Sequence, residues 1–276
     1  MNKKCGKILL TGFSNAGKST LINALLRKKV SIVSHKVQTT NKKIKAVLNY
    51  DFNQLIFVDT PGIITTKKFF DKHMSRTLFD DVKSFDLNIF IFDSSRALNE
   101  ELIENIRKVT SFYKKNFLAL NKIDLVDRES LLSKIKKINE KIDFTETFPI
   151  SAKKKRGIDI LLQKIIKNIP SGEWLFKDNK ISTEDFKFQL SEITREKIFR
   201  LTNKEIPYSV TIQTTTNNLK NLIKINQTIF VKKKSQKPIL IGKAGEKIKH
   251  IGTEARLEIQ KRFKKKVFLD IKVSNK

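Results

Sequence analysis

The stretch "GFSNAGKS", residues 12 to 19, follows the apolar run "KILL" and precedes an amphipathic segment. Its spacing fits G-x-x-x-x-G-K-[ST], with Gly12, Gly17, Lys18 and Ser19 at the fixed positions. Glycines let the backbone wrap around phosphate groups, and the N–H groups at the start of the next helix supply positive potential. The pattern predicts a strand, a phosphate-binding loop and a helix in succession.

Short β-rich runs alternate with amphipathic stretches up to about residue 170. We expect buried strands at residues 7–12, 55–60, 87–93, 117–122 and 147–151. Alternation of strands and helices predicts an α/β domain with a mainly parallel sheet covered on both faces.

Composition favours a polyanionic partner. The 276 residues include 57 Lys and Arg against 28 Asp and Glu, a net charge of +29. Residues 206–276 alone carry 17 basic and four acidic residues, a net charge of +13. The chain has one cysteine, no zinc-type spacing of its histidines, and no apolar run that could cross a bilayer or act as a secretion signal. We expect a soluble, cytoplasmic protein without a structural metal or a stable oligomer.

A domain boundary is predicted near "NIPSGEW", residues 168–174, where Pro, Ser and Gly cluster. We therefore expect one domain at 1–170, a linker at 171–181 and a smaller α+β domain at 182–276. The second domain should begin with a helix at about 183–203, with strands in 208–216, 222–235 and 267–273.

Three further motifs occur at predicted strand ends. In "DTPG" (59–62), Asp59 can hold Mg²⁺ through water and the Gly62 N–H can approach a γ-phosphate. In "NKID" (121–124), the Asp124 carboxylate can accept two hydrogen bonds from guanine, while Asn121 braces the site and the Lys122 stem lies along the base. "SAK" (151–153) adds the Ala152 N–H for the guanine O6.

Together with the first loop, these motifs predict a site for GTP or GDP with Mg²⁺. The expected contact residues are Gly12, Phe13, Ser14, Asn15, Ala16, Gly17, Lys18, Ser19, Thr20, Asp59, Thr60, Pro61, Gly62, Ile63, Asn121, Lys122, Ile123, Asp124, Ser151, Ala152 and Lys153.

A second glycine loop, "GKAG" at 242–245, lacks the spacing of a triphosphate loop. The surrounding element order resembles the type II KH fold, in which a GXXG loop clamps single-stranded nucleic acid. The expected RNA contacts are Ile241, Gly242, Lys243, Ala244, Gly245, Lys247 and Ile248, with Ile239 and Ile251 completing an apolar floor. The alternative is a plain helix-start turn with the isoleucines in the core. The lysine runs 232–234 and 264–266 are expected to be solvated surfaces that could add nonspecific phosphate contacts.

The quoted motifs, with "VQTTNKK" (37–43) and "KKFFDKHMSRTLFDDVKSFD" (67–86), resemble the Era family of translation-factor-like GTPases. The resemblance implies that Thr40 joins Ser19 and Asp59 at Mg²⁺ and meets the γ-phosphate. It also implies binding to small-subunit ribosomal RNA near its 3′ end, 30S assembly and peripheral contact with the anionic inner membrane face. The chain departs from the family at Asn41, where an arginine is usual, and lacks a tryptophan-valine pair at its end.

Hydrolysis of GTP is expected to be slow. Ile63 stands where Ras-like enzymes place the glutamine that orients water, which leaves Lys18, Thr40, Gly62 and Asn15 as catalytic candidates. Asn15 either helps hold K⁺ near the phosphates or only braces the loop, and an external activator could supply the missing group. The rival functions are an RNA chaperone or scaffold with structural GTP, and a membrane-surface GTPase.

Overall fold

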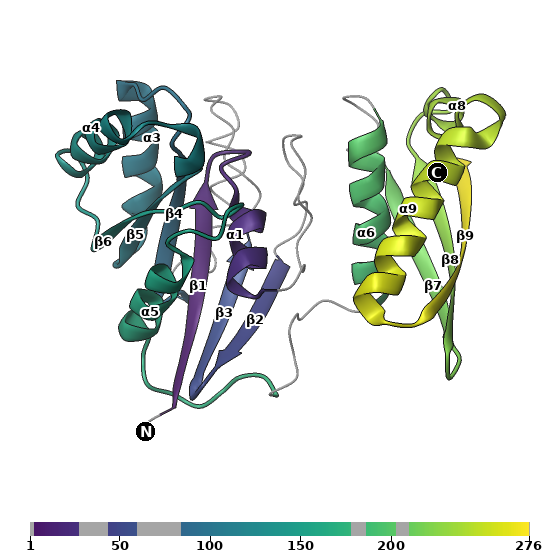
Figure 1. The fold of residues 1–276 in the computed structure, drawn as a ribbon, viewed down its shortest axis with the longest axis horizontal. Coiled ribbons are helices and arrows are strands. Elements are labelled where there is room, and N and C mark those ends of the chain that lie inside the picture. The colour runs from purple at the N-terminus through teal and green to yellow at the C-terminus, as the bar shows by residue number, and fades with distance from the viewer. Residues whose placement is uncertain (1–2, 28–43, 60–83, 178–185, 203–209, 276) are drawn as a thin grey trace. The chain divides into compact units, whose positions relative to one another are not determined.

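The computed structural model describes residues 3–27, 44–59, 84–177, 186–202 and 210–275. The described residues up to 177 form one compact unit, and those from 186 onward form a second one (Figure 1).

The first unit contains a six-stranded sheet in the order β2-β3-β1-β4-β5-β6, in which only the β2–β3 pair is antiparallel. Its strands are β1 (Lys4–Gly12), β2 (Ile44–Tyr50), β3 (Asn53–Asp59), β4 (Leu87–Asp93), β5 (Asn116–Asn121) and β6 (Glu146–Pro149). Its described α-helices are α1 (Lys18–Leu25), α3 (Glu100–Thr110), α4 (Arg128–Asn139) and α5 (Ile158–Asn168). The predicted α/β fold with a mainly parallel sheet is confirmed.

The five predicted strands are present with ends shifted by a few residues, but β2 was not predicted. Its segment "IKAVLNY" lacks the continuous apolar run of the central strands. β2 is an edge strand held by antiparallel pairing with β3. That pairing depends on tertiary contact more than on local pattern.

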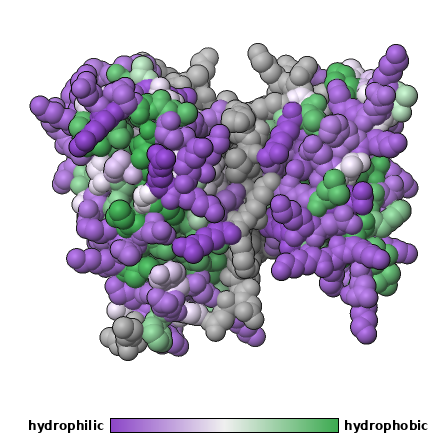
Figure 2. All heavy atoms as spheres, viewed as in Figure 1, coloured by the Kyte–Doolittle hydropathy of each residue, from purple (hydrophilic) through white to green (hydrophobic). Residues whose placement is uncertain are grey.

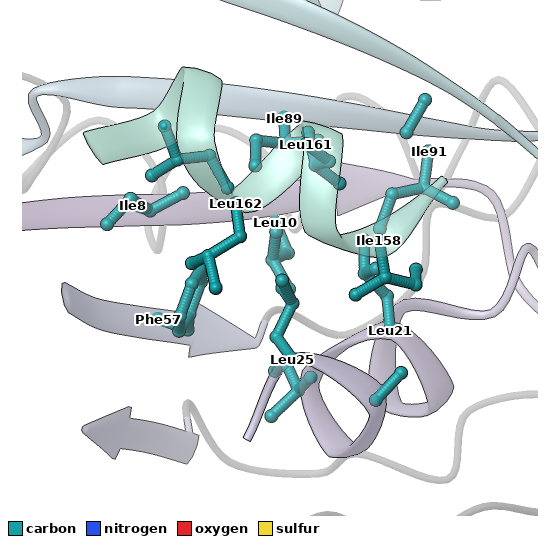
Figure 3. Packing of buried hydrophobic residues seen from close by; sticks show 14 of the residues in the cluster. Ile8, Leu10, Leu21, Leu25, Phe57, Ile89, Ile91, Ile158, Leu161 and Leu162 are labelled. Atoms are coloured by element: carbon teal, nitrogen blue, oxygen red, sulfur yellow. The ribbon is translucent and has the colours of Figure 1, made fainter. Parts of the chain in front are cut away.

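Helices cover both faces of this sheet, because the central strands are apolar on both sides. α1 and α5 pack on one face, where side chains such as Leu21, Leu25 and Leu161 meet Leu10 and Phe57 (Figure 3). α3 and α4 pack on the other face around Phe90 and Phe92. Each fully buried Leu or Phe contributes about 1.5–3 kcal/mol of hydrophobic stabilisation, so the sheet is a rigid base for the loops at its strand ends.

The start of the predicted linker belongs to the first unit. Gln54 of β3 is fully buried, and its Oε1 accepts hydrogen bonds from the backbone N–H groups of Leu175 (2.8 Å) and Phe176 (2.9 Å). Its Nε2 donates to the Phe176 carbonyl at 2.8 Å. The Trp174 indole N–H donates to the Phe52 carbonyl at 3.2 Å. Residues 171–177 therefore lie against the beginnings of β1 and β3.

The second unit contains α6 (Phe186–Leu201), β7 (Thr211–Asn218), β8 (Leu222–Val231), α8 (Gln236–Ile241), α9 (Glu246–Phe263) and β9 (Lys266–Asn275). Its sheet has the order β7-β8-β9, with β7–β8 antiparallel and β8–β9 parallel. α6 and α9 pack on one face through residues such as Leu190, Ile225, Ala255 and Ile259. This is the predicted small α+β fold, with the element order expected of a type II KH domain.

Hydrophilic residues predominate on the visible surface of each unit, with hydrophobic residues scattered among them (Figure 2). No helix in the described part of the chain is long and apolar enough to cross a membrane.

Candidate functional site

The phosphate loop joins β1 to α1 and depends on glycines at two positions. Gly12 and Gly17 have φ angles of 139° and 101°. A Cβ at Gly12 would lie 2.3 Å from the Ile91 carbonyl oxygen, and one at Gly17 would lie 2.2 Å from Asn121 Nδ2. Neither position can accept a side chain without moving its neighbours, so the fixed glycines follow from the packing of the loop.

Lys18 lies beneath this loop, and its ammonium group is held in place by two backbone carbonyl groups of the loop. Its Nζ donates to the carbonyl oxygens of Gly12 and Phe13, both at 3.0 Å. Burial lowers the pKa of Lys18 from 10.5 to about 8, although the negative charge of Asp59 opposes this shift. A bound anion would relieve this cost of burial, as expected of a phosphate ligand.

Ser19, in the first turn of α1, meets Asp59 at the carboxyl end of β3. The Ser19 hydroxyl donates to Asp59 Oδ2 at 2.7 Å, and the Asp59 side chain is fully buried. A hydroxyl and a carboxylate at this distance are the oxygen ligands that Mg²⁺ prefers. The two residues therefore fit the predicted metal role.

Asn121 connects three motifs. Its Nδ2 donates to the Ala16 carbonyl of the phosphate loop at 2.8 Å, and its Oδ1 accepts from the Ala152 N–H at 2.9 Å. The predicted bracing role matches this geometry. Because the Ala152 N–H bonds to Asn121, it would have to be shared or exchanged to reach a guanine O6.

Asp124 is held by the "SAK" turn. The Ser151 hydroxyl donates to Asp124 Oδ1 at 2.5 Å, and this hydrogen bond is the largest cause that lowers the pKa of Asp124 below its ordinary 3.8. The carboxylate is therefore ionised at neutral pH and available as an acceptor.

Sequence reasoning missed Asp93, the last residue of β4. Its Oδ2 lies 2.6 Å from Lys122 Nζ, and its Oδ1 accepts hydrogen bonds from the backbone and hydroxyl of Ser95. Lys122 has a φ of 66°, which turns the chain into "NKID". The position of Asp93 at the carboxyl end of a parallel strand was the signal that could have identified it.

The remaining predicted nucleotide residues differ in placement. Phe13 packs its ring against Phe90 and Phe92, so only its backbone faces the loop. Ser14 and Ala16 are buried, Asn15 is exposed with a φ of 64°, and Thr20, Ile123 and Lys153 are partly or fully exposed. Thr40, Thr60, Pro61, Gly62 and Ile63 lie outside the described residues.

The second glycine loop joins α8 to α9. Gly242 has φ 78° and ψ 176°, and Gly245, the N-cap of α9, has φ 78°. A Cβ at Gly242 would lie 2.7 Å from Lys247 Cβ, whereas nothing lies within 4 Å of one at Gly245. Lys243 and Ala244 are exposed, and Lys247 is half-buried. The open side of Gly245 leaves room for another backbone to approach.

The isoleucines around this loop do not form one apolar floor. Ile251 is fully buried in the core with Leu240, so its predicted base contact was wrong. Ile241 and Ile248 are half-buried and Ile239 is 48% exposed. The 3.6-residue period of α9 turns Ile251 toward the sheet.

Comparisons with known proteins identify relatives of both units. The family described as "50S ribosome-binding GTPase" matches residues 7–122, and the KH domain family matches residues 205–276. GTPase Era of Afipia carboxidovorans is 40% identical over 258 residues, which cover 93% of this chain and 84% of that protein. GTPase Era of Syntrophus aciditrophicus is 39% identical over 271 residues, which cover 97% and 89%.

Two solved structures match nearly the whole chain. One is Era in complex with MgGDPNP and nucleotides 1506–1542 of 16S ribosomal RNA, with a TM-score of 0.90, 33% identity and coverage of 99% of this chain and 94% of that one. The other is a variant of Aquifex aeolicus Era bound to GDP·AlF4⁻, with a TM-score of 0.88, 34% identity and the same coverage. The relatives of high identity and the two solved structures that match both units are all Era proteins, and the chain belongs to the Era family of GTPases.

Proposed function

We propose that this protein is a GTP-hydrolysing switch that binds small-subunit ribosomal RNA near its 3′ end and acts in assembly of the 30S subunit. The observation that carries the proposal is the match, over 99% of the chain, to an Era structure that contains MgGDPNP and nucleotides 1506–1542 of 16S ribosomal RNA.

Guanine selectivity is assigned to Asp124. Its carboxylate accepts hydrogen bonds from N1–H and the exocyclic amine of guanine, a pair of donors that adenine does not offer. Ser151 holds the carboxylate in place, and Asp93 holds the ammonium group of Lys122 so that its stem can lie along the base. The Ala152 N–H donates to the guanine O6 while it shares its hydrogen bond to Asn121 Oδ1.

The phosphates are assigned to the backbone N–H groups of residues 13–20 and to the Lys18 ammonium group. Ser19, Asp59 and Thr40 would hold Mg²⁺, which would neutralise charge on the β- and γ-phosphates. Thr40 and Gly62 would contact the γ-phosphate and so distinguish GTP from GDP.

Slow intrinsic hydrolysis is part of the proposal, because the apolar Ile63 side chain cannot orient a water molecule. Asn15 is exposed at the rim of the phosphate loop, a position from which its amide oxygen can help hold K⁺ beside the phosphates. The competing possibility is that Asn15 only braces the loop.

RNA binding is assigned to the GKAG loop of the second unit. Gly245 leaves space for a phosphate backbone at the N-terminus of α9, and Lys243 and Lys247 supply positive charge. We assign residues 1–170 to the GTPase domain, 171–181 to a linker whose residues 171–177 pack on that domain, and 182–276 to the KH domain. A monomer in the cytoplasm with peripheral contact at the anionic inner membrane face completes the proposal, with support from the net charge of +29.

A matched pair of variants tests the RNA function. Gly245→Asp places a carboxylate where the phosphate backbone would approach. A side chain is strained at this φ of 78°, although Asp and Asn adopt it more readily than other residues, so the two variants carry the same strain. RNA affinity should fall at least about 10-fold, the effect of losing one charged contact, while GTP affinity stays unchanged. Gly245→Asn is the control, because it has the same shape without the charge. Gly242→Asp is less informative, because its Cβ would clash with Lys247.

The switch function is tested by GTP turnover with and without the 16S 3′ RNA and 30S subunits. A switch would be supported if RNA or 30S subunits change the rate of GTP turnover in the wild type. In Gly245→Asp the turnover rate should then no longer respond to RNA. Turnover that is negligible throughout would favour the rival function of an RNA scaffold with structural GTP.

A further inference from the structure

Phe268 of β9 has an exposed aromatic side chain, although the residues before and after it pack in the core. It is 58% exposed, whereas Val267 is buried and Leu269 packs against the same core. Since successive side chains of a strand point to opposite faces, Phe268 lies on the face of the sheet that α6 and α9 do not cover.

Two lysines border Phe268 on this face. Lys224 of β8 is its direct partner in the parallel register, about 4.8 Å away between strands. Lys266 precedes it by two residues, about 7 Å along β9. Both lysines are exposed, so two flexible ammonium groups lie within reach of the space above one ring.

Apart from Leu222 and Phe230 of β8, which are half-buried, the rest of this face is polar and carries little negative charge. Its outward residues on β7 and β8 include Gln213, Thr215 and Asn226, with Lys272 further along β9. Asp270 is the single carboxylate that the described strands direct to this face, and it follows Phe268 by two residues on β9. An aromatic ring beside two lysines, on a surface that is mostly polar, offers the stacking platform and positive charge that single-stranded nucleic acid uses. A membrane anchor would need a broader apolar face.

The GKAG loop is close enough to this surface for one extended RNA segment to contact both. Gly252 is seven residues, about 10 Å of helix, beyond Gly245, and a Cβ on it would lie 3.5 Å from Ile271 Cδ1. Phe268 is three residues, about 10 Å of strand, before Ile271. β9 is one of the two outer strands of the described sheet, so a chain clamped at Gly245 can follow its edge for about 20 Å and reach Phe268.

The lysine run 264–266, expected to be a solvated tip, is part of a defined turn. Lys264 has φ 52°, and its N–H donates to the Gln260 carbonyl at 2.8 Å. This bond closes α9, and β9 begins at Lys266. Lys266 and Phe268 lie on the same face because they are two residues apart in the strand.

We propose that Phe268, Lys224 and Lys266 form a second contact for single-stranded RNA, in which a base stacks on Phe268 and its flanking phosphates meet the two lysines. The contact would bind the RNA segment that continues from the one clamped at GKAG. The inference rests on the proposed RNA-binding function and extends it from one loop to a track along β9.

The test compares full-length proteins on RNA with the sequence of 16S nucleotides 1506–1542 and on truncations of it from either end, by fluorescence anisotropy. Phe268→Ala should weaken binding of the long RNA by about fivefold or more, the effect of removing one base stack. Phe268→Trp should retain affinity. The weakening in Phe268→Ala should disappear for truncations that bind only at GKAG. Replacing Lys224 and Lys266 together by Ala should reduce the slope of log affinity against log salt by about 0.7 for each phosphate that is no longer neutralised.

Matched controls are Leu257→Ala, which removes a side chain 53% exposed on α9, and the pair Lys108→Ala and Lys137→Ala, which removes the same charge from the first unit. Long-RNA affinity equal to wild type in Phe268→Ala would overturn the inference. The inference would also be overturned if Phe268→Ala lost binding to vesicles of phosphatidylglycerol and phosphatidylcholine but kept its RNA binding, because the surface would then bind a membrane. If wild type binds none of these RNAs, the proposed function itself fails, and this outcome is distinct from the other two.

Discussion

The Ser151 hydroxyl donates a 2.5 Å hydrogen bond to Asp124 Oδ1 and thereby joins the "SAK" turn to "NKID" across 27 residues of chain. This contact fixes the carboxylate that would face the base and lowers its pKa. The Asp124 carboxylate therefore remains an acceptor as pH falls, until the pH reaches its depressed pKa below 3.8.

Replacing Asp124 by Asn should move nucleotide preference from guanine toward xanthine. The amide would present a donor where guanine also has donors, and two charge-assisted bonds would be removed, so GTP affinity should fall by roughly 100-fold or more. Competition binding of GTP and XTP measures the change. Asn139→Ala, an exposed amide on α4, is the control, and unchanged GTP preference in Asp124→Asn would contradict the assignment.

Lys18 should make nucleotide binding depend on alkaline pH. The folded-state pKa of about 8 lies below the ordinary 10.5, so the unfolded chain binds more protons between these values. The contribution of this group to stability therefore rises with pH across that window. Bound phosphates favour the charged form, so nucleotide binding at about pH 9 should take up a proton and at about pH 7 should not.

Calorimetry in two buffers of different ionisation enthalpy measures this proton uptake. Lys18→Arg is the matched control, because arginine stays charged while the alkaline titration of guanine itself is unchanged. Equal uptake in wild type and Lys18→Arg would show that Lys18 is not the source.

A buried polar chain across three strands should be important for stability. Thr11 donates to Asn88 Oδ1 and Asn88 donates to Asn116 Oδ1, both at 2.8 Å. Asn88→Leu would leave two buried partners without these bonds, at about 1–3 kcal/mol each, so we expect a loss of about 2–4 kcal/mol. Urea unfolding of the nucleotide-free protein measures it, and a change below about 0.5 kcal/mol, typical of an exposed site, would contradict the prediction.

Gln54 should hold the segment that leads out of the first unit. Gln54→Ala removes the acceptor shared by the Leu175 and Phe176 amides, so these amides should lose protection from hydrogen exchange. Asn53→Ala is the control, because its side chain bonds only the adjacent turn at Tyr50. Unchanged exchange at residues 175 and 176 would mean that the segment is held by its other contacts.

Asn15 should confer dependence on K⁺ if it helps hold that ion. GTP turnover in K⁺ should exceed turnover in Na⁺, and Asn15→Ala should remove the difference. Equal rates in both salts, with Asn15→Ala no slower, would leave Asn15 as a brace of the loop.

Local sequence was sufficient for the motifs. The Gly12–Ser19 loop, Asp59, Asn121 and Asp124 were predicted because each requires a particular side chain or backbone freedom at a strand end, and strand ends follow from apolar runs. The GKAG loop was predicted from the spacing of its two glycines and from the element order around it, and both glycines have positive φ in the structure.

Tertiary structure alone decided which of these residues are partners. The bonds from Asn121 to Ala16 and Ala152, from Lys122 to Asp93, and from Gln54 to the segment after α5 join residues 29 to 122 positions apart. Such pairs depend on the register of neighbouring strands, and a shift of one residue would send each side chain to the opposite face. The sequence by itself determined which chemical groups stand at the strand ends. The packed sheet decided which groups meet, because contact between distant residues depends on the whole core.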